Sequence, residues 1–327
     1  MVIDWEHHYL PEELWLKKGG KKEDRKVIYE HGRPRAQLNP ELYDIETHLE
    51  VMDAVGIDIA VLSMAGTADN TQAALEECKV WNDRTAEVTK KYPNRFVGLA
   101  PIPPFGGDAA FAELNRAVDS LGLKGVVMRS QVEGHLLDSQ QLYPFYEKVS
   151  ALNIPIFVHP SGVQLGFDVL DAPYDLGRPV GRELDLIVAT ARIILSGVLE
   201  DFPDLIFVIS HKGGGIAALK ERIDYRFGEP GTPSNRTDGA RINKSFDTYF
   251  KKIYFNLAGH AGGMNSVKCA LTTITPSRLV FATDYPQNFS EDPMKIRSYI
   301  ENIKQLEIDE ESKELMLGGN AARLLRL

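Results

Sequence analysis

Short apolar runs alternate with longer amphipathic stretches along the whole chain. Each run is rich in Val, Ile, Leu or Phe and is too short for a core helix, which is typical of parallel strands buried on both faces. Helical patterns such as "PELYDIETHLEVMDAVG" lie between the runs, and most of them end at Gly, Asn or Pro. The eight apolar runs span residues 2–8, 57–64, 96–102, 124–130, 154–160, 205–211, 252–259 and 278–284.

Eight strands with interleaved helices predict a (β/α)8 TIM barrel that forms a single domain over residues 1–327. A doubly wound open sheet is the alternative, but that fold usually has a glycine-rich phosphate loop after its first strand, and this chain has none there. Two long insertions interrupt the pattern, residues 11–40 after the first strand and residues 160–180 after the fifth. Long loops at the carboxyl ends of barrel strands usually form lids or substrate walls.

Charge and composition narrow the range of partners. A formal net charge of -9 argues against nucleic acids and anionic membranes, because both attract basic patches. No stretch reaches the roughly 18 apolar residues of a membrane span, and the N-terminus lacks the pattern of a signal peptide. The two cysteines, Cys78 and Cys269, are far apart and outside any metal-binding spacing. We therefore expect a cytoplasmic protein that acts on a small molecule.

Side chains suited to metal binding or proton transfer stand at the carboxyl ends of several predicted strands, where barrel enzymes build their active sites. Any one of them could be structural, as part of a buried ion pair or a turn before proline. Their coincidence at one end of the barrel is difficult to produce by packing alone. These side chains are Glu6 and His8 on the first strand, His159 on the fifth, His211 on the sixth and Asp284 on the eighth.

The first strand combines four ionisable residues with an apolar stretch. Because side chains alternate across a strand, we expect Asp4, Glu6 and His8 on one face and His7 on the other. Glu6 and His8 are then a pair of ligands for one divalent ion, and His7 packs against a helix. Asp4 lies deeper in the barrel, and we expect it to orient its neighbours rather than to bind metal.

Several phrases stand in a specific order and spacing: "IFVHP" at the fifth strand, "DFPDLIFVISHKGGGI" around the sixth, "RLVFATDYP" at the eighth and the closing "GGNAARLLRL". Together they resemble the amidohydrolase-related family of aminocarboxymuconate-semialdehyde decarboxylase. The resemblance runs essentially from end to end. Most members have His-x-His in the first strand, whereas this chain has Glu6-x-His8, which resembles the branch of gamma-resorcylate and 5-carboxyvanillate decarboxylases.

This resemblance implies that Glu6, His8, His159 and Asp284 bind the metal and that His211 is the acid–base residue. Family members use zinc or manganese, and two carboxylates with two imidazoles make Mn(II) credible, with Zn(II) as the alternative. The fourth strand has no lysine of the kind that bridges two metals in binuclear relatives, so one ion is expected. The resemblance also implies a homodimer.

The expected activity is non-oxidative decarboxylation of a hydroxylated aromatic or dienoic carboxylic acid, with the metal chelating the substrate and His211 and Asp284 handling the proton. The alternative is hydrolysis of a lactone or amide, or hydration, by metal-activated water. A non-catalytic role, in which the metal only stabilises the barrel or a partner binds an outer face, is a more distant alternative. Structural zinc sites are usually rich in cysteine, and neither cysteine lies near a strand end.

Four further residues are candidates for contacts with the substrate. Arg129 ends the fourth predicted strand, where it could bind a carboxylate or form a salt bridge at the barrel rim. His260 follows the seventh strand and stands at the barrel mouth. Phe167 and Tyr174 belong to the second insertion, where their rings could cover an aromatic substrate or pack within the loop.

Overall fold

All eight predicted barrel strands are present in the structure, and the third is split in two. The structure, a computed structural model, describes the chain except residues 22–25, 31–32, 65–70, 163–164, 171–172, 228–238 and 260–262. The barrel strands are β1 (Ile3–His8), β4 (Ile59–Ser63), β5 (Phe96–Gly98), β6 (Ala100–Pro101), β7 (Val126–Arg129), β10 (Pro155–His159), β11 (Ile206–Ile209), β12 (Tyr254–Asn256) and β13 (Leu279–Val280).

These strands pair in parallel and in chain order, as sheets β1-β4-β5 and β13-β12-β11-β10-β7-β6. The backbone that follows β13 runs beside β1. There the Trp5 amide donates to the Phe281 carbonyl at 2.9 Å, and the Asp284 amide donates to the Glu6 carbonyl at 2.8 Å. The first and last strands are therefore neighbours. The parallel order with intervening helices confirms the predicted (β/α)8 fold.

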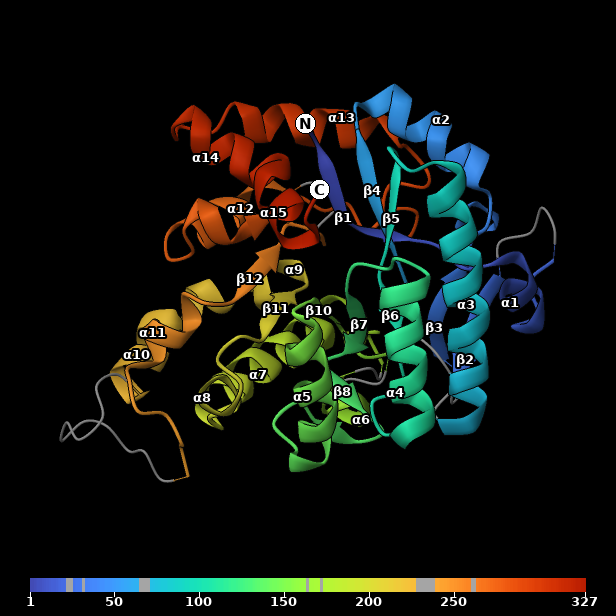
Figure 1. Cartoon of the computed structure of the whole chain (residues 1–327). Coiled ribbons are helices and arrows are strands. Elements are labelled where there is room, and N and C mark those ends of the chain that lie inside the picture. Colours follow the sequence, from blue (N-terminus) through green and yellow to red (C-terminus); the bar gives the residue numbers. More distant parts are fainter. Residues whose placement is uncertain are drawn as a thin grey trace.

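Helices surround the strands on the outside of the barrel (Figure 1). The longer ones cover the apolar outer faces of the strands. The described helices are α1 (Glu12–Lys17), η1 (Pro40–Leu42), α2 (Ile45–Val55), α3 (Thr71–Lys91), α4 (Gly107–Asn115), η2 (Arg116–Ser120), η3 (Gln140–Leu142), α5 (Tyr143–Leu152), α6 (Phe167–Leu170), η4 (Gly177–Gly181), α7 (Arg182–Leu195), α8 (Val198–Asp201), α9 (His211–Gly214), η5 (Ile216–Leu219), α10 (Lys220–Phe227), α11 (Phe246–Phe250), α12 (Met264–Leu271), η7 (Pro276–Arg278), α13 (Met294–Lys304), α14 (Glu310–Glu314), η8 (Leu315–Gly319) and α15 (Asn320–Leu325).

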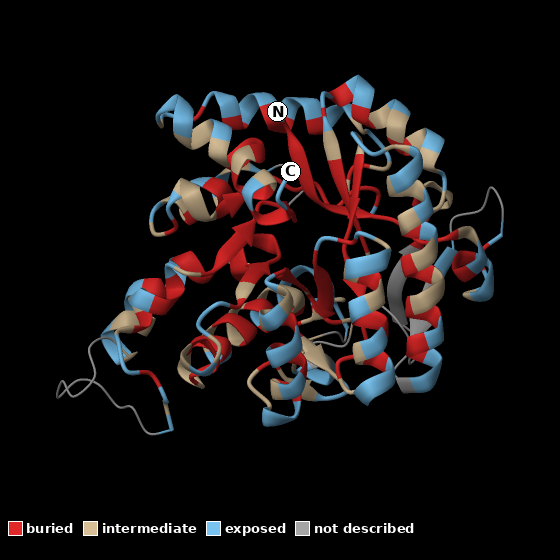
Figure 2. Ribbon diagram, in the orientation of Figure 1, coloured by how far each residue is buried: buried red, intermediate tan, exposed pale blue. Residues whose placement is uncertain are grey.

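Alternate residues of the strands belong to two separate apolar clusters. Inside the barrel, Trp5 and Phe157 belong to a cluster that also includes Leu324 of α15. The residues between them, such as Ile156 and Val158, pack outward in the cluster shared with the helices. Both faces of the strands are therefore buried (Figure 2), which is why each strand appears in the sequence as a continuous apolar run.

The two insertions contain regular structure, so the expectation of long loops after the first and fifth strands was too simple. Residues 11–40 include α1 and an antiparallel hairpin of β2 (Lys26–Glu30) and β3 (Arg33–Leu38). Residues 160–180 include α6 and most of η4, and a second small hairpin, β8 (Gln131–Val132) and β9 (His135–Leu136), follows β7. Within the described part of the chain, no helix has the length and apolar character needed to cross a membrane.

Candidate metal centre

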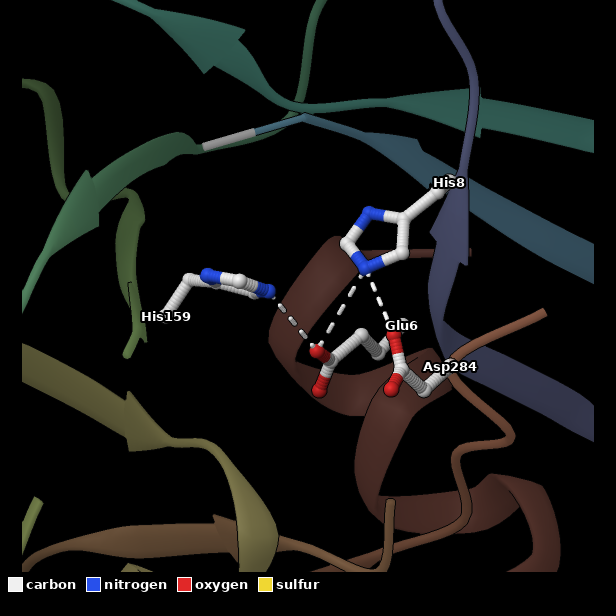
Figure 3. A group of neighbouring side chains, drawn as sticks. All are labelled: Glu6, His8, His159 and Asp284. Carbon is white, nitrogen blue, oxygen red and sulfur yellow. Dashed lines mark ion pairs between the residues drawn. The ribbon is translucent and has the colours of Figure 1, made fainter. Parts of the chain in front are cut away.

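Four predicted ligands converge at the carboxyl end of the barrel: Glu6, His8, His159 and Asp284 (Figure 3). One donor atom from each lies within 4.8 Å of all the others. The Nε2 atom of His8 is 2.7 Å from Oδ1 of Asp284 and 3.7 Å from Oε1 of Glu6, and Nε2 of His159 is 3.4 Å from the same Glu6 oxygen. The donors surround one small volume, as the ligands of a single ion do.

A β-bulge in the first strand places two consecutive residues, Trp5 and Glu6, on the inner face. Asp4 pairs with Ala60 and His7 pairs with Leu62. Between these pairs β1 advances three residues and β4 only two, so β1 contains one extra residue. Trp5 therefore stays inside the barrel with Glu6, and the alternation restarts one residue later. The prediction that Asp4 shares a face with Glu6 and His8 was wrong. Asp4 instead contacts His7, with Oδ2 2.8 Å from Nδ1.

Glu6 is completely buried, and its two carboxylate oxygens have different surroundings. Oε2 accepts hydrogen bonds from Ser210 Oγ at 2.6 Å and from Asn256 Nδ2 at 2.7 Å. Oε1 has no hydrogen-bond donor among the described residues and faces the histidines. Burial, followed by the charge of Asp284, raises the pKa of Glu6. A buried carboxylate oxygen of this kind requires a cation or a proton.

Hydrogen bonds to backbone carbonyls orient the two histidines of this candidate site. His8 donates from Nδ1 to the Ser63 carbonyl at 3.2 Å, and His159 donates from Nδ1 to the Pro160 carbonyl at 2.9 Å. Because a carbonyl only accepts, both rings keep a proton on Nδ1 and turn Nε2 toward the centre. Burial, with the charges of His8 and His211, holds the pKa of His159 well below its usual value, which keeps this imidazole neutral.

His211 lies beside the four ligands and is oriented by a different set of contacts. Its Nδ1 hydrogen-bonds Oε1 of Glu183 in α7 at 2.8 Å, while its buried Nε2 has no hydrogen-bond partner in the described part of the chain. A Cβ on Gly259 would be 2.9 Å from Cγ of His211, so only glycine leaves room for the ring. Burial lowers the pKa of His211, but the Glu183 charge and hydrogen bond outweigh this effect and raise it.

Both predicted proton-handling residues have left-handed backbone conformations. The φ angles of His211 and Asp284 are +50° and +62°. Such angles are unfavourable for residues with a Cβ and persist where the surrounding structure holds them, as at active sites. Asp284 Oδ2 also accepts a hydrogen bond from Asn288 Nδ2 at 2.8 Å, which leaves Oδ1 directed at His8.

The structure describes only some of the four residues predicted to contact the substrate. Arg129 ends β7, is partly buried and pairs in register with the ligand His159. Tyr174 is 78% exposed. The side chain of Phe167 and all of His260 lie outside the described residues. The roles of these residues stay predictions. Glu183 was missed, because no spacing in the sequence connects a residue on a helix after the fifth strand with a histidine after the sixth.

Comparison with known proteins identifies the family. The sequence profile described as Amidohydrolase matches residues 3–327. The chain belongs to the amidohydrolase family. It is 28% identical over 297 residues to 2-amino-3-carboxymuconate-6-semialdehyde decarboxylase of Dictyostelium discoideum, which covers 89% of this chain and 79% of that protein. It is also 28% identical over 344 residues to gamma-resorcylate decarboxylase of Polaromonas sp. strain JS666, with 99% and 98% covered.

A solved structure extends the comparison to the metal. The crystal structure of dihydroxybenzoic acid decarboxylase from Polaromonas sp. JS666, with bound manganese and the inhibitor 2-nitroresorcinol, matches this amidohydrolase with a TM-score of 0.79. The two chains are 26% identical, and the match covers 100% of this chain and 97% of that one. In the present chain, the carboxylates of Glu6 and Asp284, with the imidazoles of His8 and His159, provide a donor set suited to a divalent cation, and Oε1 of Glu6 accepts no hydrogen bond from the described residues.

We predict that the purified protein binds about one divalent ion per chain and that Glu6→Ala or Asp284→Ala abolishes this binding, because either change removes a charged ligand. Elemental analysis by plasma mass spectrometry after dialysis measures the ratio. Glu50→Ala, which removes an exposed carboxylate from α2, is the matched control and should keep the metal. A full metal complement in both ligand variants would contradict the assignment.

Metal affinity should also increase with pH. Burial lowers the pKa of His8, but the hydrogen bond and charge of Asp284 and the charge of Glu6 outweigh it and raise the pKa to about 9. At neutral pH the metal-free His8 therefore carries a proton on Nε2 that a metal must displace. The apparent association constant for Mn(II) should increase about tenfold per pH unit between about pH 6 and 8. Chelator competition measures it, and a constant affinity over this range would refute the prediction.

Proposed function

We propose that this amidohydrolase catalyses the metal-dependent, non-oxidative decarboxylation of a hydroxylated aromatic or dienoic carboxylic acid. The observation that carries the proposal is the oriented His211, whose unpartnered Nε2 lies beside a separate set of four metal-binding side chains. A metal that only stabilised the barrel would need no such group. The names of the relatives, two decarboxylases of carboxylic acids and a manganese-containing decarboxylase, support the same reaction.

A proton must reach the carbon that bears the carboxylate, and the chain has two groups to supply it. His211 donates from Nε2 to this carbon, the bond to the carboxylate breaks, and its electron pair remains with the substrate as CO2 leaves. Glu183 favours the protonated form of His211, since it raises the pKa of this imidazole. Asp284 is the second proton carrier. A bound divalent ion would supply positive charge to hold the substrate carboxylate and an adjacent oxygen.

Hydrolysis of a lactone or amide, the alternative, places a different demand on the same imidazole. There His211 would act as a base and would have to be neutral when it takes a proton from water. The carboxylate of Glu183, 2.8 Å from Nδ1, stabilises the opposite charge state. Decarboxylation therefore suits the electrostatics of the site better. For the metal, two carboxylates with two imidazoles favour Mn(II), with Zn(II) as the alternative.

We further propose that the enzyme works as a homodimer in the cytoplasm. Large apolar side chains are exposed in and after the second insertion, at Val169, Tyr174, Leu176, Val180 and Leu184. Burying them against a second copy would remove this apolar area from water. Analytical ultracentrifugation should then give twice the mass of the chain, and Val169→Asp with Leu184→Asp should shift the protein toward the monomer. A monomeric parent protein would refute the dimer.

The reaction is tested by CO2 release. Mn-loaded and Zn-loaded protein is incubated with ortho-hydroxybenzoates, hydroxylated isophthalates and aminocarboxymuconate-type acids, and evolved CO2 is measured. We expect metal-dependent CO2 from at least one of these acids. His211→Asn should reduce the rate by about 10²- to 10⁴-fold, as expected for loss of a proton donor, while the bound metal stays unchanged.

Two results would contradict this function. Hydrolysis of a lactone or amide by metal-loaded protein, without CO2 from any of the acids, would assign the site to the alternative. Full decarboxylase activity of a correctly folded His211→Asn variant would show that His211 is not the proton donor. Glu50→Ala serves again as the control for nonspecific effects of substitution.

A further inference from the structure

A continuous chain of three buried side chains lies on the outer side of β1, away from the metal ligands. Oδ2 of Asp4 is 2.8 Å from Nδ1 of His7, and Nε2 of His7 is 2.8 Å from Nδ1 of His48 in α2. Nε2 of His48 is 2.5 Å from the Glu41 carbonyl in η1. The three side chains are completely buried. Apolar residues could fill this space at less cost, so the chain calls for an explanation other than packing.

The hydrogen bonds in this chain have a defined direction. The Glu41 carbonyl only accepts, so His48 carries its proton on Nε2 and offers the lone pair of Nδ1. His7 must then donate from Nε2 to His48. A further proton lies between Nδ1 of His7 and Asp4. Burial, and after it the charge of His7, hold the pKa of His48 well below its usual value, which agrees with its role as an acceptor.

The Asp4 end of this hydrogen-bonded chain contacts the residues on both sides of Asp284. Asp4 accepts from the Thr283 amide at 2.8 Å and from the Thr283 hydroxyl at 2.5 Å. The Thr283 hydroxyl in turn accepts from the Tyr285 amide at 3.0 Å. The Tyr285 ring lies against both imidazoles, with centroids 5.2 Å from His7 and 5.6 Å from His48. The residues before and after Asp284 are thus both fixed by this chain.

Asp284 needs this support because its φ of +62° is a strained conformation. We propose that His48 is a positioning residue of the metal centre: by accepting the hydrogen bond of His7, it fixes Asp4 and, through Thr283, the backbone that directs the Asp284 carboxylate at the metal. The inference rests on the proposed metal binding but does not depend on the reaction. It extends the support of the site to the helix α2, which carries His48.

Two amide substitutions separate the two hydrogen bonds of His48. The carboxamide of His48→Asn occupies the position of Nδ1 and can still accept from His7. The longer carboxamide of His48→Gln occupies the position of Nε2 and can donate to the Glu41 carbonyl, but it leaves His7 without its acceptor. His48→Leu removes both bonds. At the Asp4 end of the hydrogen-bonded chain, Thr283→Val keeps the shape of threonine and removes the hydroxyl that contacts Asp4.

The readout is the affinity for Mn(II), measured by chelator competition without substrate on protein shown by circular dichroism to be folded. We expect His48→Gln, His48→Leu and Thr283→Val to weaken binding by about 10- to 100-fold, the usual effect of losing a residue that orients a metal ligand. His48→Asn should stay close to the parent protein. In Co(II)-loaded protein, the visible absorption bands should change in the first three variants and be retained in His48→Asn, because these bands report ligand geometry.

Other outcomes would overturn the proposal. Parent-like affinity and Co(II) spectra in folded His48→Gln or Thr283→Val would show that the chain serves stability alone, and equal losses in His48→Asn and His48→Gln would show that the acceptor is not what matters. A parent protein that binds no Mn(II) would refute both this inference and the metal site. A parent that binds Mn(II) but releases no CO2 would refute only the decarboxylase, since affinity is measured without substrate.

Discussion

The burial of two carboxylates, Glu6 and Asp284, at one end of the barrel is the constraint on which the rest of the site depends. Removing one such charge from water costs several kcal/mol unless it is compensated, and the second carboxylate adds repulsion to this cost. A bound divalent cation would neutralise both charges at once. Two features of the site suit such a cation. His159 is neutral, and the hydrogen bonds to Glu6 engage Oε2 and leave Oε1 available. His211 pairs with a carboxylate outside this set, Glu183, and the charges of Glu6 and Asp284 add to the effect of Glu183 on its pKa.

The regular barrel is distorted where this chemistry requires it. A bulge in β1 brings Glu6 into the interior after Trp5, and His211 and Asp284, which follow β11 and β13, have left-handed backbone conformations. Each distortion is held by specific contacts. The Asp284 amide donates to the Glu6 carbonyl, so the bulged strand and the strained residue stabilise one another across the first and last strands of the barrel.

These distortions mark the limit of what the sequence predicts. Strands buried on both faces leave continuous apolar runs, so the fold can be predicted from the pattern. A barrel places its site at the carboxyl ends of its strands, so the candidate residues can be predicted from their positions. These are Glu6, His8, His159, His211 and Asp284. A bulge has no such signature. Strict alternation therefore assigned Asp4 to the wrong face. The partnership of Glu183 with His211 depends on how α7 packs against the barrel, and only tertiary structure reveals it.

The cluster of ionisable residues in "DWEHH" is explained by both faces of one strand. On the inner face, Glu6 and His8 are directed at the metal centre, while on the outer face Asp4 and His7 connect to His48 and to Thr283. A ligand and its support thus alternate along a single rigid element. Because β1 also pairs with the segment that carries Asp284, displacement of this strand would alter three ligands together. The geometry of the centre is therefore set more by the strand than by the loops that surround it.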